Sequence, residues 1–137
     1  MKVLHLDCAS GISGDMLLGA LVDLGVELRT LRSGLALLPL TGYTVTSREV
    51  ERSYFGARKV DVKVGRQRGH RGLREIRAII EGSRLESSIK EASLRVFRRL
   101  IQVEARIHRI SEQKVHLHEV GAVDAIVDIV GAVIGFH

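Results

Sequence analysis

The sequence predicts an α/β fold in which a small mixed sheet of about three to four strands packs with about five helices. Short apolar runs bounded by turn residues indicate strands, and leucines and isoleucines recur at helical spacing between them. The chain has 137 residues, of which 45% are hydrophobic and 27% charged, and this fits one domain with its own core. We therefore expect residues 1–137 to form a single domain.

The first third of the chain predicts a strand, a loop and two helices. Residues 2–8 form an apolar run of strand length, which ends at a Gly/Ser loop over residues 9–14. A helix follows over residues 15–24, with Ser13 suited to its N-cap. Leucines at helical spacing predict a second helix over residues 28–38.

The middle of the chain predicts two strands and two helices. Alternation of apolar and polar residues over 43–47 and 60–64 indicates strands. Residues 65–72 form a basic, Gly-rich loop without periodicity, which we expect to be flexible. Apolar spacing then predicts a short helix over residues 73–80 and a long one over residues 85–110.

The C-terminal end predicts a short strand or turn over residues 115–119 and a helix from about Ala122. Asp124 and Asp128 interrupt its apolar run, so it is not predicted to span a membrane. The helix still continues at His137 without a cap or breaker, so we expect the natural polypeptide to be longer.

The compartment follows from what the sequence lacks. One cysteine, Cys8, cannot form an internal disulfide, and no basic and apolar leader of a signal peptide is present. With no predicted membrane span, we expect a soluble, cytoplasmic domain.

The charge of the chain is unevenly distributed. Residues 48–109 hold 17 Lys and Arg against 8 Asp and Glu, whereas both ends are weakly acidic. Such a run is most often a solvated face, but it also permits an RNA-binding or polyanion-binding module. Only 4% of the chain is aromatic, and no aromatic residue is expected among the arginines of the loop and long helix to stack on bases.

The first candidate site is the predicted junction between the strand over residues 2–8 and the helix after it. Backbone N–H groups at such a junction can hold an anion or cofactor, a role that would fall to Ser10, Gly11, Ser13 and Gly14. No Lys-Ser/Thr pair follows, so the loop is not a P-loop. Asp15 would repel a phosphate unless a metal lay between them. In an equally weighted alternative, Asp15 only stabilises the positive helix end. Cys8 is a possible soft ligand, but a small buried strand residue is the more common role.

The second candidate site combines histidines and carboxylates near the C-terminus. In an extended segment, His116 and His118 point to the same side, beside Glu119, and this set suits a borderline metal such as nickel or zinc. Asp124 and Asp128 fall four apart in the following helix, on a stripe that continues through Gly131 and Gly135. In the simpler interpretation the glycines allow close helix packing, and Asp128 pairs with a basic residue.

These two segments carry a family resemblance. The patterns Asp7-x-x-x-Gly11-x-Ser13-Gly14-Asp15-Met16 and His116-x-His118-Glu119-Val120-Gly121-Ala122-x-Asp124-x-Ile126-x-Asp128 resemble the LarC nickel-insertion family. The resemblance runs along the whole chain, which corresponds to about the first third of the usual family protein.

The resemblance implies a nickel chelatase. Family members insert nickel into a pyridinium bis-thiocarboxylic acid mononucleotide, which forms the nickel-pincer nucleotide cofactor of lactate racemase. The reaction consumes CTP with manganese or magnesium and forms a nickel–carbon bond. The implied partners are this mononucleotide, the C-terminal part of the same protein and lactate racemase. A homo-oligomer is a further option.

The family motifs map onto seven polar residues of this chain, and we hypothesise a division of roles among them. His116 and His118 would hold nickel, with Glu119 as a third ligand or as the base. Asp7 and Asp15 would hold a hard cation, so that Asp15 and Glu119 are the catalytic candidates. Asp124 and Asp128 would orient the imidazoles, and both count among the metal-site residues.

The chain departs from the family in two respects. Family members commonly carry a His-rich run after the second strand, whereas residues 65–72 contain His70 alone. The C-terminal part, where we expect the CTP site, is also absent, so this chain would bind metal without turnover. A divalent-metal phosphohydrolase that uses Asp7 and Asp15 is a third option.

Overall fold

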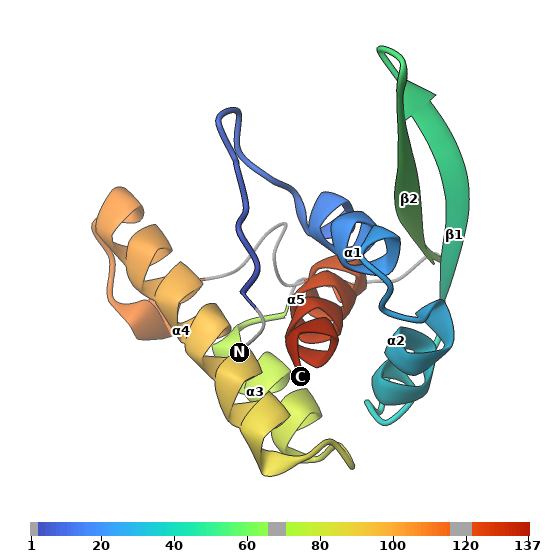
Figure 1. Ribbon diagram of the computed structural model, residues 1–137. Coiled ribbons are helices and arrows are strands. Elements are labelled where there is room, and N and C mark those ends of the chain that lie inside the picture. Colours follow the sequence, from blue (N-terminus) through green and yellow to red (C-terminus); the bar gives the residue numbers. More distant parts are fainter. Residues whose placement is uncertain (1–2, 66–70, 116–121) are drawn as a thin grey trace.

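The computed structural model describes residues 3–65, 71–115 and 122–137. Within these residues, the chain forms five α-helices, one short 3-10 helix and two strands (Figure 1). Their bounds are α1 (Gly14–Asp23), α2 (Leu28–Leu35), β1 (Tyr43–Arg52), β2 (Phe55–Val64), α3 (Leu73–Glu81), α4 (Ser87–His108), η1 (Glu112–Lys114) and α5 (Val123–Phe136). The predicted α/β class and five helices are confirmed.

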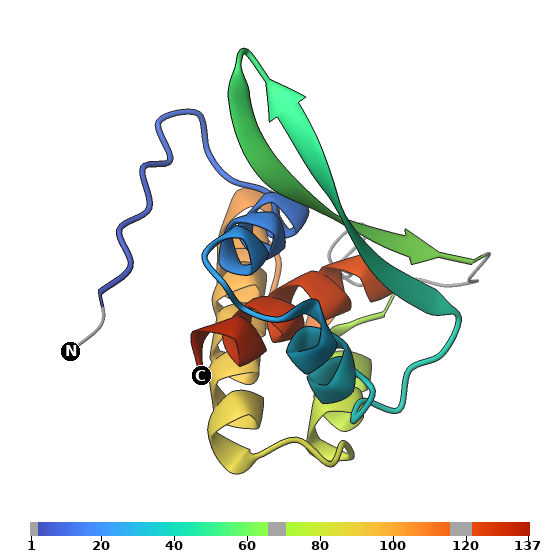
Figure 2. The same ribbon diagram turned by 45° about the vertical axis from the view of Figure 1, so that its right-hand side comes forward.

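Helix α5 lies at the centre of the fold. Eight of its 14 residues are buried, because valines, isoleucines and small residues surround its axis on nearly all sides. It packs against α1, α2, α4 and β2. Figures 1 and 2 show it between the pair α1 and α2 and the pair α3 and α4. Side chains on α5 are therefore held on the most buried scaffold of the described chain.

Glycines let α1 approach α5 closely. A Cβ atom at Gly131 would lie 3.1 Å from a Leu18 methyl carbon, and one at Gly135 would lie 2.7 Å from a Leu21 methyl carbon. The glycine stripe predicted on this helix therefore serves close packing. This contact fixes the start of α1 relative to the first turns of α5.

The two strands form an antiparallel hairpin. Tyr43 pairs with Val64 at its base and Arg52 with Phe55 at its tip. The hairpin is joined by a two-residue turn, Ser53 and Tyr54, in which both residues have positive φ values of 49° and 69°. The hairpin packs along α1 through the middle of β2, where Gly19 lies against the backbone of Arg58 and Val60, and its tip extends beyond the helices (Figure 2).

The expected strand over residues 2–8 is not formed among residues 3–8. The structure describes this segment as irregular and exposed, with 78% of Val3 and 40% of Leu6 accessible to solvent. Cys8 is exposed as well, so its assignment as a buried strand residue is wrong. The described sheet therefore has two antiparallel strands instead of a mixed sheet of three to four. The predicted strand does not form because no described strand lies beside residues 3–8 to pair with them.

The remaining elements agree with the sequence expectations or lie outside the described residues. α1 begins after Ser13, and Gly25 follows its end with a φ of 106°. The predicted flexible loop over residues 65–72 and the strand or turn over residues 115–119 fall largely on residues 66–70 and 116–121, which the structure does not describe. None of the described helices is long and apolar enough to cross a membrane.

Candidate functional site

The candidate site lies where the start of α1 meets the first two turns of α5. Gly14, the first residue of α1, faces the side chain of Asp128 so closely that a Cβ atom there would lie 2.5 Å from the Asp128 Cβ and Oδ2 atoms. Only glycine therefore fits at this point of the helix. The sequence shows Gly14 and Asp128 as separate motif residues, and only the packing of α1 on α5 brings them together.

Two further carboxylates lie close to Asp128. Its pKa is raised to about 6, mainly by burial, and the negative charges of Asp15 and Asp124 contribute to the same rise. The positive end of the α1 dipole favours the ionised carboxylate, but burial and the two like charges outweigh it. We call Asp15, Asp124 and Asp128 the acidic cluster.

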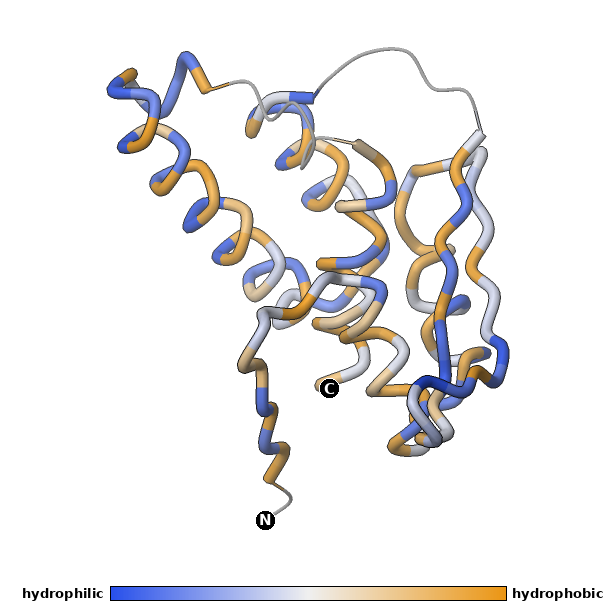
Figure 3. Tube along the Cα trace, turned by 90° about the horizontal axis from the view of Figure 1, so that it is seen from above, coloured by the Kyte–Doolittle hydropathy of each residue, from blue (hydrophilic) through white to orange (hydrophobic). Residues whose placement is uncertain are grey.

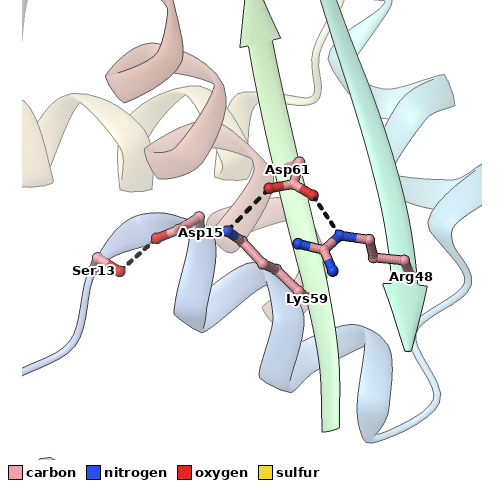
Figure 4. A network of polar contacts seen from close by, with 5 residues as sticks. All are labelled: Ser13, Asp15, Arg48, Lys59 and Asp61. Atoms are coloured by element: carbon pink, nitrogen blue, oxygen red, sulfur yellow. Dashed lines mark hydrogen bonds and ion pairs between the residues drawn. The ribbon is translucent and has the colours of Figure 1, made fainter. Parts of the chain in front are cut away.

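The hydrogen bonding of the acidic cluster leaves one oxygen atom without a partner. Asp15 Oδ1 accepts a hydrogen bond from the Ser13 hydroxyl (Figure 4), and Asp124 Oδ1 accepts one of 2.9 Å from the Ala125 N–H. Asp128 Oδ1 is buried and has no hydrogen-bond partner in the described part of the chain. A buried, unpaired carboxylate oxygen is costly, and a proton or a cation would relieve that cost.

The acidic cluster by itself is not a complete metal site. In residues 3–65, 71–115 and 122–137, no three His, Cys, Asp or Glu side chains are placed closely enough to hold a metal ion. The structure thus brings Asp15, Asp124 and Asp128 into one region without giving them coordinating geometry. Other ligands would have to complete the site.

The predicted anion cradle has the geometry of a tight turn. The Gly11 N–H donates a 2.9 Å hydrogen bond to the Cys8 carbonyl, and Gly11 has a φ of 82°, which favours glycine. Ser10 is exposed in the same turn, and the Ser13 hydroxyl bonds to Asp15 instead of capping α1. Because Asp128 occupies the space in front of Gly14, this helix start suits a cation better than a phosphate.

The other predicted site residues do not join the acidic cluster in the described structure. Asp7 is exposed on the irregular segment that leads to α1. His116, His118 and Glu119 lie outside the described residues. They precede the start of α5 in the sequence, whose N-cap is Ala122.

An ion-pair network on the hairpin was not predicted from the sequence. Asp61 lies 3.2 Å from Lys59 Nζ and 3.2 Å from Arg48 Nε (Figure 4). The hydrogen bond from Lys59 is the main reason why the pKa of Asp61 is lowered. Desolvation opposes this effect, and Arg48 adds to the lowering. In the strand register, Arg48 lies opposite Lys59 and next to Asp61. The alternation of residues along the two strands could therefore have predicted this network.

A cavity of about 610 Å³ lies between the start of α3 and η1. Leu73 and Val115 give it apolar walls. Two charges of each sign also line it, from Arg74, Arg77, Glu75 and Glu112. Its size falls in the range of small-molecule sites. Val115 is also the last described residue before the segment that carries His116 and His118.

Comparison with known proteins decides the family. The family model described as "Nickel insertion protein" matches residues 4–137, which is nearly the whole chain. The chain belongs to the nickel insertion protein family. The family resemblance drawn from the two motifs is thereby confirmed.

Individual members of the nickel insertion protein family are similar over nearly the whole chain. A pyridinium-3,5-bisthiocarboxylic acid mononucleotide nickel insertion protein from Desulfitobacterium hafniense is 50% identical over 136 residues, which cover 99% of this chain and 34% of the relative. Relatives from Wolinella succinogenes and Citrifermentans bemidjiense, also named for nickel insertion, are 49% and 47% identical and match over 98% of this chain and 35% of their own length. The chain thus spans about a third of these relatives. No solved structure matches it.

Proposed function

We propose that this chain supplies a metal-binding part of a nickel chelatase, which inserts nickel into a pyridinium bis-thiocarboxylic acid mononucleotide. Family membership over residues 4–137 supports the activity class. The observation in the structure that carries the proposal is the acidic cluster, in which a buried Asp128 oxygen lacks a partner beside Asp15 and Asp124. Nickel is the cargo of this reaction, and the cluster would attract it.

The proposed nickel ligands come from the segment before α5. Imidazole nitrogen atoms of His116 and His118 suit nickel, and Glu119 offers a carboxylate as a third ligand. Glu119 could instead accept the proton that leaves the pyridinium ring when the nickel–carbon bond forms. The nearby negative charge of Asp124 and Asp128 would favour the divalent ion and orient the imidazoles. Asp15 and Asp7 would hold a hard cation at the start of α1.

The cavity beside α3 is the proposed binding place for the organic substrate. A pyridinium mononucleotide carries a positive ring and a negative phosphate, and Glu112 and Arg74 offer the complementary charges. Leu73 and Val115 would contact the ring. The substrate would then bind where the chain continues into His116 and His118.

The nucleotide cofactor does not fit the described residues. The family implies CTP with manganese or magnesium, but Asp15 and Asp128 occupy the one helix start that the sequence offered for its phosphates. We therefore derive no step through CTP and place its site in the part that the longer relatives have and this chain lacks. That part and lactate racemase are the proposed protein partners, and the setting is proposed to be cytoplasmic.

Thermal unfolding with nickel tests this proposal. Nickel at about 100 times its dissociation constant should stabilise the chain by about 2.7 kcal/mol, which raises the Tm by several degrees. The variant His116→Ala/His118→Ala should lose this shift. His108→Ala, which removes an exposed histidine paired with Glu104 on α4, should keep it. An equal shift in all three proteins would assign the effect to sites elsewhere and contradict the proposal.

Binding of RNA or another polyanion is the alternative function, and one observation favours it. Two aromatic side chains lie among basic residues at the hairpin tip, apart from the loop and the long helix that the sequence analysis considered. Tyr54 and Phe55 are 97% and 77% exposed at the hairpin tip, next to Arg52 and near Arg58. This arrangement can stack on bases. If RNA binds with a steep salt dependence that Tyr54→Ala removes, while nickel does not stabilise the chain, this alternative replaces the nickel proposal.

A further inference from the structure

The segment of residues 3–8 has the sequence of a strand but no strand neighbour. Its apolar side chains are open to water, with Val3 78%, Leu4 39% and Leu6 40% exposed. Figures 2 and 3 show the segment leading from α1 away from the helices. Three exposed apolar residues within four positions are an unfavourable arrangement for a free terminus, because their burial would be worth about 25 cal/mol for each Å² covered.

The backbone of this segment is also unpaired. In the part of the chain that the structure describes, residues 3–7 form no backbone hydrogen bond, and the first one links the Gly11 N–H to the Cys8 carbonyl. Extended residues with free N–H and C=O groups on both sides can accept a strand on either edge. Alternating side chains would place Leu4 and Leu6 together on one face.

The described sheet is not available to this segment. In both Figure 1 and Figure 2, the hairpin of β1 and β2 and the segment lie on opposite sides of α1. The strand partner must therefore come from outside the described chain. A second copy pairing through the same segment would give only a two-stranded ribbon, which is marginal in water.

The length of the relatives identifies a better partner. The matched relatives extend over about three times the length of this chain, which covers only 34% to 35% of them. Such a polypeptide is long enough to hold a sheet of several strands. We propose that residues 3–8 form a strand that adds to a sheet in the part of the protein corresponding to the remaining two thirds of these relatives.

The proposed strand would also change the candidate site. A strand that ends at Cys8, a turn at Gly11 and the helix α1 form a β-loop-α unit, and ligands bind at the carboxyl ends of strands in such units. Docking would fix Asp7 at that end, beside the start of α1 and the acidic cluster. This consequence rests on the proposed function, whereas the strand pairing itself does not.

Hydrogen exchange without nickel tests the pairing. In the isolated chain, the amides of residues 4–8 should exchange at nearly the unprotected rate. In the intact Desulfitobacterium hafniense relative, the aligned segment should exchange at least about 100-fold more slowly. Equal exchange in both proteins would overturn the proposal. Protection in the isolated chain that vanishes on dilution would also overturn it, in favour of pairing between two copies.

A trans-assembly experiment adds a matched pair of variants. The remaining two thirds of that relative, shown by circular dichroism to be folded, should form a 1:1 complex with this chain. Leu4→Asp/Leu6→Asp should weaken the complex at least about tenfold with little change in the Tm of the isolated chain, because neither side chain belongs to the hydrophobic core of the described chain or packs against it. The control Ile107→Asp, at an exposed position of α4, should bind as the wild type does. Equal weakening by both variants, or none by either, would contradict the proposed strand. Because no metal is present, these results are independent of nickel binding.

Discussion

Asp128 is the residue at which stability and the proposed chemistry oppose each other. Its carboxyl group is held on the central helix, against Gly14 and close to the charges of Asp15 and Asp124. At neutral pH it is ionised at a cost, because its pKa of about 6 lies well above the ordinary value of 3.8. A cation bound nearby would recover that cost as binding free energy.

The raised pKa predicts how Asp128 affects stability as the pH changes. The folded state favours the protonated acid, so its stabilising effect is complete below about pH 4 and is lost as the pH rises to about 6. Asp128→Asn cannot ionise. Relative to wild type, this variant should gain about 1–2 kcal/mol of unfolding free energy between pH 4 and pH 7.5, because solvent screens part of the cost at a half-buried carboxylate. Urea unfolding without metal measures the difference.

Two results would conflict with this view of Asp128. If the difference in unfolding free energy between Asp128→Asn and wild type is the same at pH 4 and at pH 7.5, ionisation of Asp128 carries no cost. If Asp128→Asn becomes less stable relative to wild type as the pH rises, the folded protein favours the charged form of Asp128. Asp61→Asn is the control, because the pKa of Asp61 is lowered by Lys59 and Arg48 and its pH dependence has the opposite sign.

At the residue scale, the sequence indicated which groups matter but not which of them meet. The spacing of Asp124 and Asp128 placed both on one helix stripe, and the structure agrees that their charges interact. The contact between Gly14 and Asp128 joins residues more than 100 positions apart. It depends on how α1 crosses α5, and helical periodicity holds no information about that crossing.

Helix α4 shows how an element tolerates a polar group in its buried face. Its buried side comprises Ser93, Phe97, Ile101 and Ala105, four apart along the helix. The Ser93 hydroxyl is fully buried and has no hydrogen-bond partner among the described residues. Such a group lowers the free energy of unfolding, because its bonds to water are lost without replacement.

Removal of this hydroxyl should stabilise the protein. We expect Ser93→Ala to raise the free energy of unfolding by about 1 kcal/mol, from the lost desolvation cost and the higher helix propensity of alanine. Ser88→Ala is the matched control, since Ser88 lies exposed in the first turn of the same helix and tests propensity alone. If both variants change the midpoint of urea unfolding equally, the buried hydroxyl carries no cost.

The hairpin turn is a second element with a predictable defect. Ser53 and Tyr54 adopt the positive φ values that two-residue hairpin turns need, although neither residue favours them. Ser53→Asn/Tyr54→Gly should therefore raise the unfolding free energy by about 1 kcal/mol. Thr44→Asn, at an exposed strand position near the hairpin base, should not stabilise the protein. A loss of stability in the turn variant would mean that the exposed Tyr54 ring contributes more than the backbone conformation costs.

Elements were predictable where a pattern is local. Helical spacing identified α1 to α5, and alternation identified the two strands of the hairpin. The expected strand at residues 3–8 has the right composition, but a strand needs a neighbour, and none is present in the described chain. The apolar run over residues 2–8 therefore led to too many predicted strands, whereas alternation identified the two strands of the hairpin.

For the whole molecule, the described chain holds the acidic cluster on a rigid centre and leaves one strand-like end unpaired. Helix α5 is buried and fixes Asp124 and Asp128, while the segment that carries Asp7 lies open. The family relatives are about three times as long. Under the proposed function, the part that corresponds to the rest of these relatives would complete a metal site to which this chain contributes.

Calorimetric titration with nickel at pH 7.5 tests the central claim most directly, in wild type, His116→Ala/His118→Ala, Asp128→Asn and Asp61→Asn. The wild type should bind one nickel ion, and the histidine variant should bind none. Asp128→Asn should bind about tenfold more weakly, because one negative charge near the ion is removed, a loss of about 1.4 kcal/mol. Asp61→Asn, which changes an aspartate already paired with Lys59 and Arg48, should bind as the wild type does. Equal affinity in Asp128→Asn and wild type, or unchanged binding in the histidine variant, would contradict the claim that His116 and His118 bind nickel with the support of Asp128 on α5.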